Sequence, residues 1–419
     1  MVGWLLLAPG MLAAQPRKKI SLDEACRLAQ QNYPLVKQKD LVKQTAALTV
    51  ENLSKGLLPQ VSISGQASYQ SDVTRIDVSL PGFSFEPPSR DQYKLVADVS
   101  QLLFDGGLTR EQKTVQQLNA AVEESRVDVE LYKVQDRVSQ VYLSVLYLDQ
   151  QLKQVELVKA DIGTGIRKVD AMVQNGTAFR SGLSMLQAEQ LKAEQRAIEI
   201  RASRQGMIDV LALFLGQALD SAVVFERPTA VTGLVDSPAV ISRPELKLFA
   251  GQSRLALQQQ RLLQAKTLPK ASLFVQSGYG KPGLNFLKNS FDFYYIGGLR
   301  LNWSLGGYYT IKKEKQLVAL NKQNVDLQQE TFLLNTRTQL KQQESEIGKL
   351  RRLIATDTEI IRLRHSVTDA AKAQLDNGVI TAGDFLREVN AEDQARQALI
   401  AHEVQLLQAQ INYKTTSGN

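Results

Sequence analysis

The most regular pattern of apolar residues in the chain lies between residues 127 and 173. Apolar side chains recur there in alternating steps of three and four residues, with one lapse at Lys159. This spacing puts a narrow apolar stripe on one side of an α-helix, as in helices that pack along other long helices. No proline occurs between Gly107 and Asn175. We therefore expect one helix over residues 107–173, roughly 100 Å long at about 1.5 Å per residue.

The pattern returns about 200 residues later, which indicates an internal duplication. A second long helix is expected over residues 307–375, with apolar positions at Leu340, Ile347, Leu350, Ile354, Ile361 and Leu375. The turn after the first long helix recurs after the second long helix. The glycine pair before the first long helix likewise recurs before the second long helix. The turn residues are Asn175, Gly176 and Thr177, then Asn377, Gly378 and Val379. The residues before the helices are Asp105, Gly106 and Gly107, then Gly306 and Gly307.

Two segments change from the helical period to a period of two. From Val61 to Tyr69, apolar and polar residues alternate, and a second alternating run ends near Leu103. Alternation of this kind is typical of strands with one apolar and one polar face. We expect a strand pair over residues 61–103 and an equivalent pair over residues 271–303.

These elements divide the chain into two similar halves. Residues 1–14 form an apolar segment ending in Ala-Ala and are predicted to be a signal peptide. The first repeat covers residues 15–216 and ends in a return helix at 183–216. A linker with two prolines and a glycine covers residues 217–242. The second repeat covers residues 243–419 and has its return helix at 383–413.

The second strand pair is rich in aromatic residues, and no other segment offers to cover its apolar face. A soluble sheet with an aromatic core is one interpretation. Strands of about 9–11 residues with aromatic ends also fit a sheet that spans a membrane, and we favour that interpretation. Four strands cannot close on themselves, so several copies are required. Two copies would give an eight-stranded barrel whose interior is filled by side chains. Three copies would give a twelve-stranded barrel around a lumen.

Charge and reactive residues point away from nucleic-acid binding and catalysis. The formal net charge is +7, and positively and negatively charged residues are both spread along the chain. No basic cluster is interleaved with aromatic residues. The two histidines, His365 and His402, lie on different expected helices. We expect them to be solvated, since a metal site needs three or four converging donors. The sequence predicts no enzyme, no metal, no cofactor and no nucleic-acid partner.

The order helix, strand pair, long helix and return helix, given twice, resembles the TolC family of outer-membrane efflux proteins. The resemblance covers nearly the whole chain, about residues 20–413. Single motifs in it are weak, but their order in duplicate is specific. They are Leu58-Pro59, Leu103-Phe104-Asp105-Gly106-Gly107, Leu268-Pro269, Asn175-Gly176-Thr177 and Asn377-Gly378-Val379.

The resemblance implies a mainly α fold with a small β part. Three protomers would form a 12-stranded membrane β-barrel, continued by a periplasmic α-helical coiled-coil tube. Such a homotrimer lies in the outer membrane of a Gram-negative bacterium and meets a periplasmic adaptor protein and an inner-membrane transporter. It would be the exit duct of a tripartite efflux or type I secretion system for drugs, metals or proteins. The two turns would lie at its periplasmic tip.

The resemblance also implies an acidic periplasmic entrance. Asp384 matches the first acidic position of the family's constriction, whereas Arg387 occupies the next, with Glu388 beside it. Asp384 and Glu388 are four residues apart and share a helix face. They are expected either to face the pore or to lie outside the tip, against an adaptor.

Two other classes of protein compete with this interpretation. A structural coiled-coil tether or scaffold explains the long helices but not two amphipathic strand pairs at equivalent places. The adaptor of an export system would need a lipoyl-like module in the middle of the chain. Linker 217–242 is too short to hold one.

Overall fold

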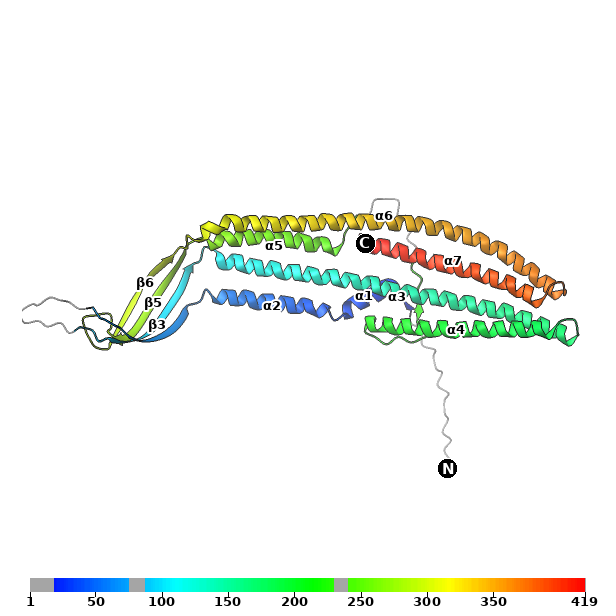
Figure 1. The fold of residues 1–419 in the computed structure, drawn as a ribbon, viewed down its shortest axis with the longest axis horizontal. Helices are drawn as coiled ribbons and strands as arrows, with labels where there is room; N and C mark the ends of the chain where they lie inside the picture. The colour runs from blue at the N-terminus through cyan, green and yellow to red at the C-terminus, as the bar shows by residue number, and fades with distance from the viewer. Residues whose placement is uncertain (1–18, 75–86, 230–239, 419) are drawn as a thin grey trace, which may run out of the picture. The chain divides into compact units, whose positions relative to one another are not determined.

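The computed structural model describes residues 19–74, 87–229 and 240–418. The predicted signal peptide and the central part of the predicted linker lie outside these residues. In chain order the elements are β1 (Lys19–Ile20), α1 (Leu22–Asn32), α2 (Val36–Lys55), β2 (Gln60–Tyr69), β3 (Asp91–Phe104), α3 (Leu108–Gln174), α4 (Arg180–Leu215), β4 (Val224–Phe225), α5 (Pro244–Lys266), β5 (Lys270–Lys281), β6 (Asp292–Asn302), α6 (Gly307–Asp376) and α7 (Ala382–Ser417) (Figure 1).

The chain forms two compact units, each assembled from separate stretches. The helical unit contains Met1–Val36, Val127–Pro244 and Phe332–Asn419. The sheet unit contains Lys37–Arg126 and Glu245–Thr331. Each unit therefore draws on both predicted repeats, because the long helices α3 and α6 contribute residues to both units. The division into two sequential repeats stays a prediction.

The sheet unit holds one antiparallel sheet with the order β2-β3-β5-β6. The two predicted strand pairs are joined side by side by β3 and β5, where Val99 lies opposite Val275. In this register the cross-strand neighbours Ile63, Ala97, Ser277 and Tyr295 share one face. Strands β2 and β6 form the two edges of the sheet within the chain.

The apolar face of this sheet is uncovered. Ile63 is 73% exposed, Leu299 74% and Leu301 72%. Tyr295 is exposed to a similar extent. Core residues of a water-soluble sheet would be buried against a second layer. The soluble-sheet interpretation is therefore not supported by the packing of the described residues of this chain.

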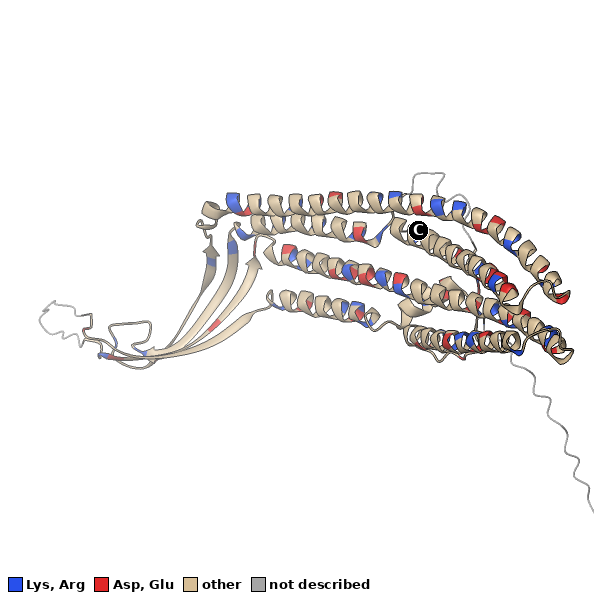
Figure 2. Cartoon of the chain, turned by 45° about the vertical axis from the view of Figure 1, so that its right-hand side comes forward, with Lys and Arg blue, Asp and Glu red and all other residues tan. Residues whose placement is uncertain are grey.

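The helices of the sheet unit follow the order of their strands. Figures 1 and 2 show α2, α3, α5 and α6 side by side, each leading into or out of the strand in the same position. Gln258 of α5 donates a hydrogen bond to Glu111 of α3. The outer helices keep exposed apolar side chains, among them Leu41 and Leu48 of α2 and Leu320 of α6. Charged residues of both signs are interspersed along the helices (Figure 2).

The helical unit has its main core where α1, α3 and α4 meet the short parallel pair β1–β4. Tyr142 of α3 is fully buried there. Its hydroxyl lies 2.8 Å from the carbonyl oxygen of Ile20 and 2.6 Å from that of Glu226, to which it can donate. Its ring meets Phe225 edge to face at 5.3 Å. A buried phenol without such acceptors would be costly, so these contacts fix the strand pair on the core.

The stripe of α3 packs as its spacing predicts. Val138, Val145 and Ile162 are completely buried. At the lapse, Lys159 forms an ion pair with Glu194 of α4 and lies 3.3 Å from Glu156. A polar bridge to the return helix thus replaces an apolar contact. Among the described residues, no helix combines the length and the apolar character needed to cross a membrane.

Candidate functional site

The two helix turns of the helical unit have the same backbone structure. Gly176 and Gly378 adopt φ values of 74° and 70°. The next residue bonds back to the preceding helix in each case: the N–H of Thr177 donates to Met172 at 2.8 Å, and that of Val379 donates to Gln374 at 2.8 Å. This is the Schellman cap, in which glycine permits the left-handed conformation.

The two turns lie at the same end of the helical unit. Lys168 of α3 forms an ion pair with Asp376 at the end of α6. A Cβ atom added to Gly182 of α4 would lie 3.2 Å from the Cβ of Ala382 of α7. Beside the turns, a buried cluster joins all four helices through Ile162, Val169, Leu186, Ala371, Leu375, Ala382, Phe385, Leu386 and Val389. The two turns and the adjoining ends of the four helices therefore form one packed body, which we call the tip.

Asp384, the first predicted entrance residue, belongs to the capping box at the start of α7, whose N-cap residue is Thr381. The Thr381 side chain accepts from the Asp384 backbone N–H at 3.2 Å, and the Asp384 carboxylate accepts from the Thr381 N–H at 3.2 Å. This capping box also includes a 2.7 Å bond from the Thr381 hydroxyl. These bonds from Thr381 lower the pKa of Asp384. The carboxylate therefore stays ionised at neutral pH and stabilises the helix N-terminus.

The other two entrance residues carry compensating charges. The Arg387 guanidinium lies 3.4 Å from Asp384 and 3.2 Å from Glu388. Glu388 also lies 3.6 Å from Arg364 of α6. Two carboxylates thus meet two guanidinium groups, and the local charge is close to balanced. A role of these residues at an entrance stays a prediction.

The two strand-to-helix junctions are not equivalent. The Asp105 carboxylate accepts from the N–H groups of Gly107 at 2.8 Å and Thr109 at 2.7 Å. Gly106 has φ 70°, and a Cβ there would lie 2.5 Å from the Cβ of Leu268. At the second junction, Gly306 has open space where a Cβ would be. The glycine echo in the sequence therefore reflects a structural need only at the first junction.

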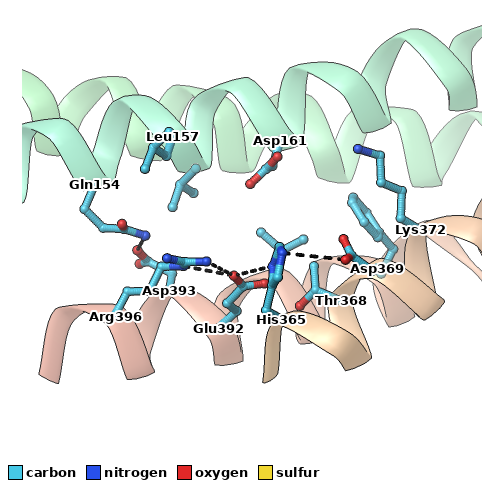
Figure 3. Close-up of a pocket in the computed structure, with 13 residues that line it drawn as sticks. Gln154, Leu157, Asp161, His365, Thr368, Asp369, Lys372, Glu392, Asp393 and Arg396 are labelled. Atoms are coloured by element: carbon cyan, nitrogen blue, oxygen red, sulfur yellow. Dashed lines mark hydrogen bonds and ion pairs between the residues drawn. The ribbon is translucent and has the colours of Figure 1, made fainter. Parts of the chain in front are cut away.

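A cleft of about 230 Å³, lined by both charged and apolar side chains, lies beside the tip between α3, α6 and α7 (Figure 3). On its floor His365 lies 3.1 Å from the Glu392 carboxylate, to which Arg396 also donates at 2.6 Å. Partial burial acts to raise the pKa of Glu392, but hydrogen bonds from Arg396 and Thr368 outweigh it and lower the pKa. Figure 3 shows Asp161 of α3 directed toward this pair.

The cleft was not predicted from the sequence, because its charged residues come from helices that are distant along the chain. The expectation that both histidines are solvated is wrong for His402, whose side chain is 25% exposed and lies 2.6 Å from Asp357. In the described residues, no group of three or more His, Cys, Asp and Glu side chains is arranged to hold a metal ion.

Comparison with known proteins gives structural matches only. No family model and no curated protein sequence matches the chain. Among solved structures, the outer membrane protein VceC from Vibrio cholerae superposes with a TM-score of 0.67 at 18% identity, covering 94% of this chain and 95% of that one. The chain has the TolC fold. The resemblance inferred from the sequence is confirmed at the level of fold.

Two further structures with the TolC fold are channels by description. The outer-membrane channel OprN matches with a TM-score of 0.69 at 12% identity, over 95% of this chain and 89% of that chain. The open state of the MtrE outer membrane channel from Neisseria gonorrhoeae matches with a TM-score of 0.66 at 14% identity, over 95% and 89%. The mainly helical fold class with a small sheet is confirmed as well.

Proposed function

We propose that the protein is an outer-membrane channel that forms the exit duct of an export system. The observation that carries this proposal is the uncovered apolar face of the sheet, where Leu299 and Leu301 are more than 70% exposed. Water disfavours such a surface, at about 25 cal/mol per Å² of apolar area. Lipid covers it without cost. The fold shared with outer-membrane channels supports the same environment.

The sheet needs copies of itself to exist in lipid. Unpaired N–H and C=O groups along β2 and β6 would each cost several kcal/mol in hydrocarbon. Pairing β6 of one copy with β2 of the next satisfies both edges. Three copies give a twelve-stranded barrel, which leaves a lumen, whereas two copies give an eight-stranded barrel whose interior is filled by side chains. A homotrimer is therefore the proposed duct.

The helices that lead to the sheet edges support the same assembly. The outer helix α2 has no buried residue, and its Leu41 and Leu48 are about 60% exposed, at 61% and 62%. At the other edge, Leu317, Leu320 and Leu327 of α6 are exposed to a similar degree. Apolar side chains at heptad-like spacing pack against a neighbouring helix. In a ring, α6 of one copy would receive α2 of the next.

The tip turns are the proposed meeting point with a periplasmic adaptor and, through it, an inner-membrane transporter. Phe179 after the first turn is 86% exposed, and Val379 in the second turn is 70% exposed. Exposed apolar side chains at two adjacent turns suit contact with another protein. Drugs, metals or proteins delivered there would leave through the lumen. Asp384 and Glu388 would contribute charge at the entrance, reduced by Arg387.

Purified protein tests the proposal in three steps. The protein should float with outer-membrane vesicles, and its mass in detergent should be that of a trimer. Reconstituted in a planar bilayer, it should produce discrete conductance steps. A monodisperse monomer that stays in the soluble fraction would instead identify a coiled-coil tether. A membrane-bound trimer without conductance would restrict the protein to a structural role in the membrane.

A further inference from the structure

Two cationic residues lie side by side on the polar face of the sheet. Arg300 of β6 is paired with Ser272 of β5, and Lys270 is paired with Asn302. Lys270, Ser272 and Gln276 are an even number of residues apart on β5, so they share one face. Arg300 and Lys270 are therefore diagonal neighbours, with Cα atoms about 7–8 Å apart. Because β5 begins at Lys270, the pair lies at the end of the sheet that meets the helices.

The side chain of Arg300 is held against the sheet. Its guanidinium carbon lies 4.4 Å from the centroid of the Phe274 ring. Phe274 is paired with Gly298, and a Cβ atom added to Gly298 would lie 3.4 Å from a carbon of that ring. The ring therefore lies over the glycine, and the guanidinium stacks on the ring. A stacked guanidinium presents its N–H donors in a fixed plane.

Among the described residues, no carboxylate compensates this pair of charges. Arg300 and Lys270 form no ion pair in that part of the chain. Asp98, on the same face, lies two strands away from Arg300 and four residues along, which is about 16 Å at about 3.3 Å per residue and about 4.8 Å per strand. Asp292 lies further along β6 and pairs with Lys288 at 2.9 Å. Both acids lie beyond the Debye length of about 10 Å at 0.1 M salt.

The neighbouring elements do not supply a carboxylate either. Asp105 follows the last residue of β3, which is paired with the second residue of β5, and so lies near Lys270 along the backbone. Its carboxylate accepts from the N–H groups of Gly107 and Thr109 and stabilises the start of α3. The strand at the other edge, β2, contains no charged residue. A second copy that joins β6 through β2 therefore brings no strand carboxylate beside Arg300.

We propose that Arg300 and Lys270 form an anion-binding site on the inner wall of the duct, for solutes that carry phosphate, sulfate or carboxylate groups. The inference rests on the proposed function, in which the apolar face of the sheet meets lipid and the polar face lines the lumen. The planar guanidinium can donate to two oxygen atoms of such a group, and the ammonium adds a positive charge beside it. Three copies would place three of these sites around the lumen at one level.

The site attracts anions without holding them tightly. Two cations in each of three copies attract anions and repel cations over about 10 Å at 0.1 M salt, and over only about 3 Å at 1 M. Arg300 and Lys270 are both exposed to water in the single chain, which keeps each contact weak. Conduction requires binding that is favourable enough to enter and weak enough to leave. Anionic solutes would therefore concentrate at this wall and still pass it.

Block of the ionic current by a polyanion tests this site. A channel added to one side of a planar bilayer keeps its helices on that side, so its sheet opens to the opposite chamber. Inositol hexakisphosphate added to that chamber should reduce the current at 0.1 M salt and should do so less at 1 M. Arg300→Gln should raise the half-blocking concentration by about tenfold, as for loss of a charge-assisted hydrogen bond. Adding Lys270→Gln should raise it further.

Matched variants separate the site from net charge. Lys281→Gln removes the same charge from the apolar face of β5, where Lys281 pairs with Asp91, and should leave the half-blocking concentration unchanged. Arg300→Lys keeps the charge without the fixed plane, and Phe274→Leu keeps the charge without the ring. Each should weaken the block less than Arg300→Gln does. Maltotriose, a neutral solute, should reduce the current equally in all variants.

The conductance steps of each variant before the polyanion is added show that the variant has assembled. A wild-type current that the polyanion does not reduce would overturn the site, and so would an unchanged block in the double variant. Equal weakening in Lys281→Gln and Arg300→Gln would also overturn it, because net charge would then be the cause. Absence of conductance steps in the wild-type protein would instead contradict the proposed function.

Discussion

The His402 imidazole on α7 lies 2.6 Å from the Asp357 carboxylate on α6, although 45 residues separate them. The Asp357 side chain is 11% exposed and occupies a polar gap in the apolar stripe of α6. A second histidine, His365, makes an equivalent contact with Glu392 at 3.1 Å. Both histidines of the chain therefore join α6 to α7, each through a carboxylate largely withdrawn from water.

Removing the two histidines should have unequal effects. His402→Ala leaves the Asp357 carboxylate without this partner in a buried place and should cost about 1–3 kcal/mol of stability. His365→Ala should cost less than about 1 kcal/mol, because His365 is more exposed and Arg396 still donates to Glu392. Denaturant unfolding of both variants at pH 7 measures the difference. Equal losses would show that the two contacts are energetically alike.

The long helices and the sheet could be predicted from the sequence because their signals are local and periodic. The stripe from Val138 to Ile162 predicts its own burial, and alternation around Ile63 predicts a strand face. The polar contacts at Lys159 and Asp357, which interrupt the apolar stripes of the long helices, could not be predicted in this way. Nothing near Asp357 or Lys159 in the sequence indicates which residue of the return helix lies opposite. The answer depends on how far the two helices are shifted along each other.

Candidate site residues were predicted less completely than the elements. The glycines of both turns follow from their cap geometry, which is local. The balance of charge around Asp384 could be predicted only in part from the sequence. Arg387 is a neighbour of Asp384 in sequence, whereas Arg364 reaches Glu388 from another helix. The cleft beside the tip is built from three helices, so no single stretch of sequence carries its pattern.

Gly106 should tolerate no side chain, whereas Gly306 should accept one. Gly106→Ala combines a left-handed backbone with a Cβ only 2.5 Å from that of Leu268 and should cost about 1–3 kcal/mol. Gly306→Ala should change stability by less than about 0.5 kcal/mol, since its side chain meets open space. Thermal unfolding of the two variants provides the measurement. A neutral Gly106→Ala would contradict the close contact with Leu268.

Charge on the two faces of the sheet should have opposite consequences. Leu299→Arg places a guanidinium on the apolar face and should cost about 2–4 kcal/mol at mid-membrane. Gln276→Arg lies on the polar face, opposite Asp98, and should be tolerated. The yield of trimer in isolated outer membranes compares them. Equal loss of trimer in both variants would refute the assignment of faces.

Asp161 should lower stability at neutral pH. Partial burial raises its pKa above the ordinary 3.8, Lys372 opposes the shift and Glu392 adds to it. A raised carboxyl pKa means that folding disfavours the ionised form, so the destabilisation is present above the folded pKa and disappears as pH falls below 3.8. Asp161→Asn should therefore raise the melting temperature at pH 7 but not near pH 3.

The size of this gain is limited because the Asp161 carboxyl keeps contact with water. Asp170→Asn, also on α3, serves as the matched control. Its carboxylate accepts a 3.0 Å hydrogen bond from Gln174, so the substitution should give no gain at either pH. A gain from Asp161→Asn that is the same at pH 3 and pH 7 would exclude ionisation as its cause.

The proposed entrance should become more cation-selective when Arg387 is removed. Arg387→Ala leaves Asp384 and Glu388 with less compensation, and three copies would raise the negative potential around a narrow opening. Reversal potentials in planar bilayers at low salt measure the change, which should shrink as salt is added. Replacing Asp384 and Glu388 with alanine should shift selectivity the other way. Unchanged selectivity in both would place these side chains outside the pore.

The contact of Gly106 with Leu268 has a consequence for how such a chain arises. A polypeptide of half this length would have to make that contact, and the β3–β5 pairing, with another molecule. Six half-length molecules would then be needed for the proposed ring, which three full-length molecules would complete. Fusing two halves makes three of the six junctions intramolecular, where the effective concentration of the partner is fixed by the connecting segment rather than by expression. Gene duplication would thereby have simplified assembly before it changed any lining residue.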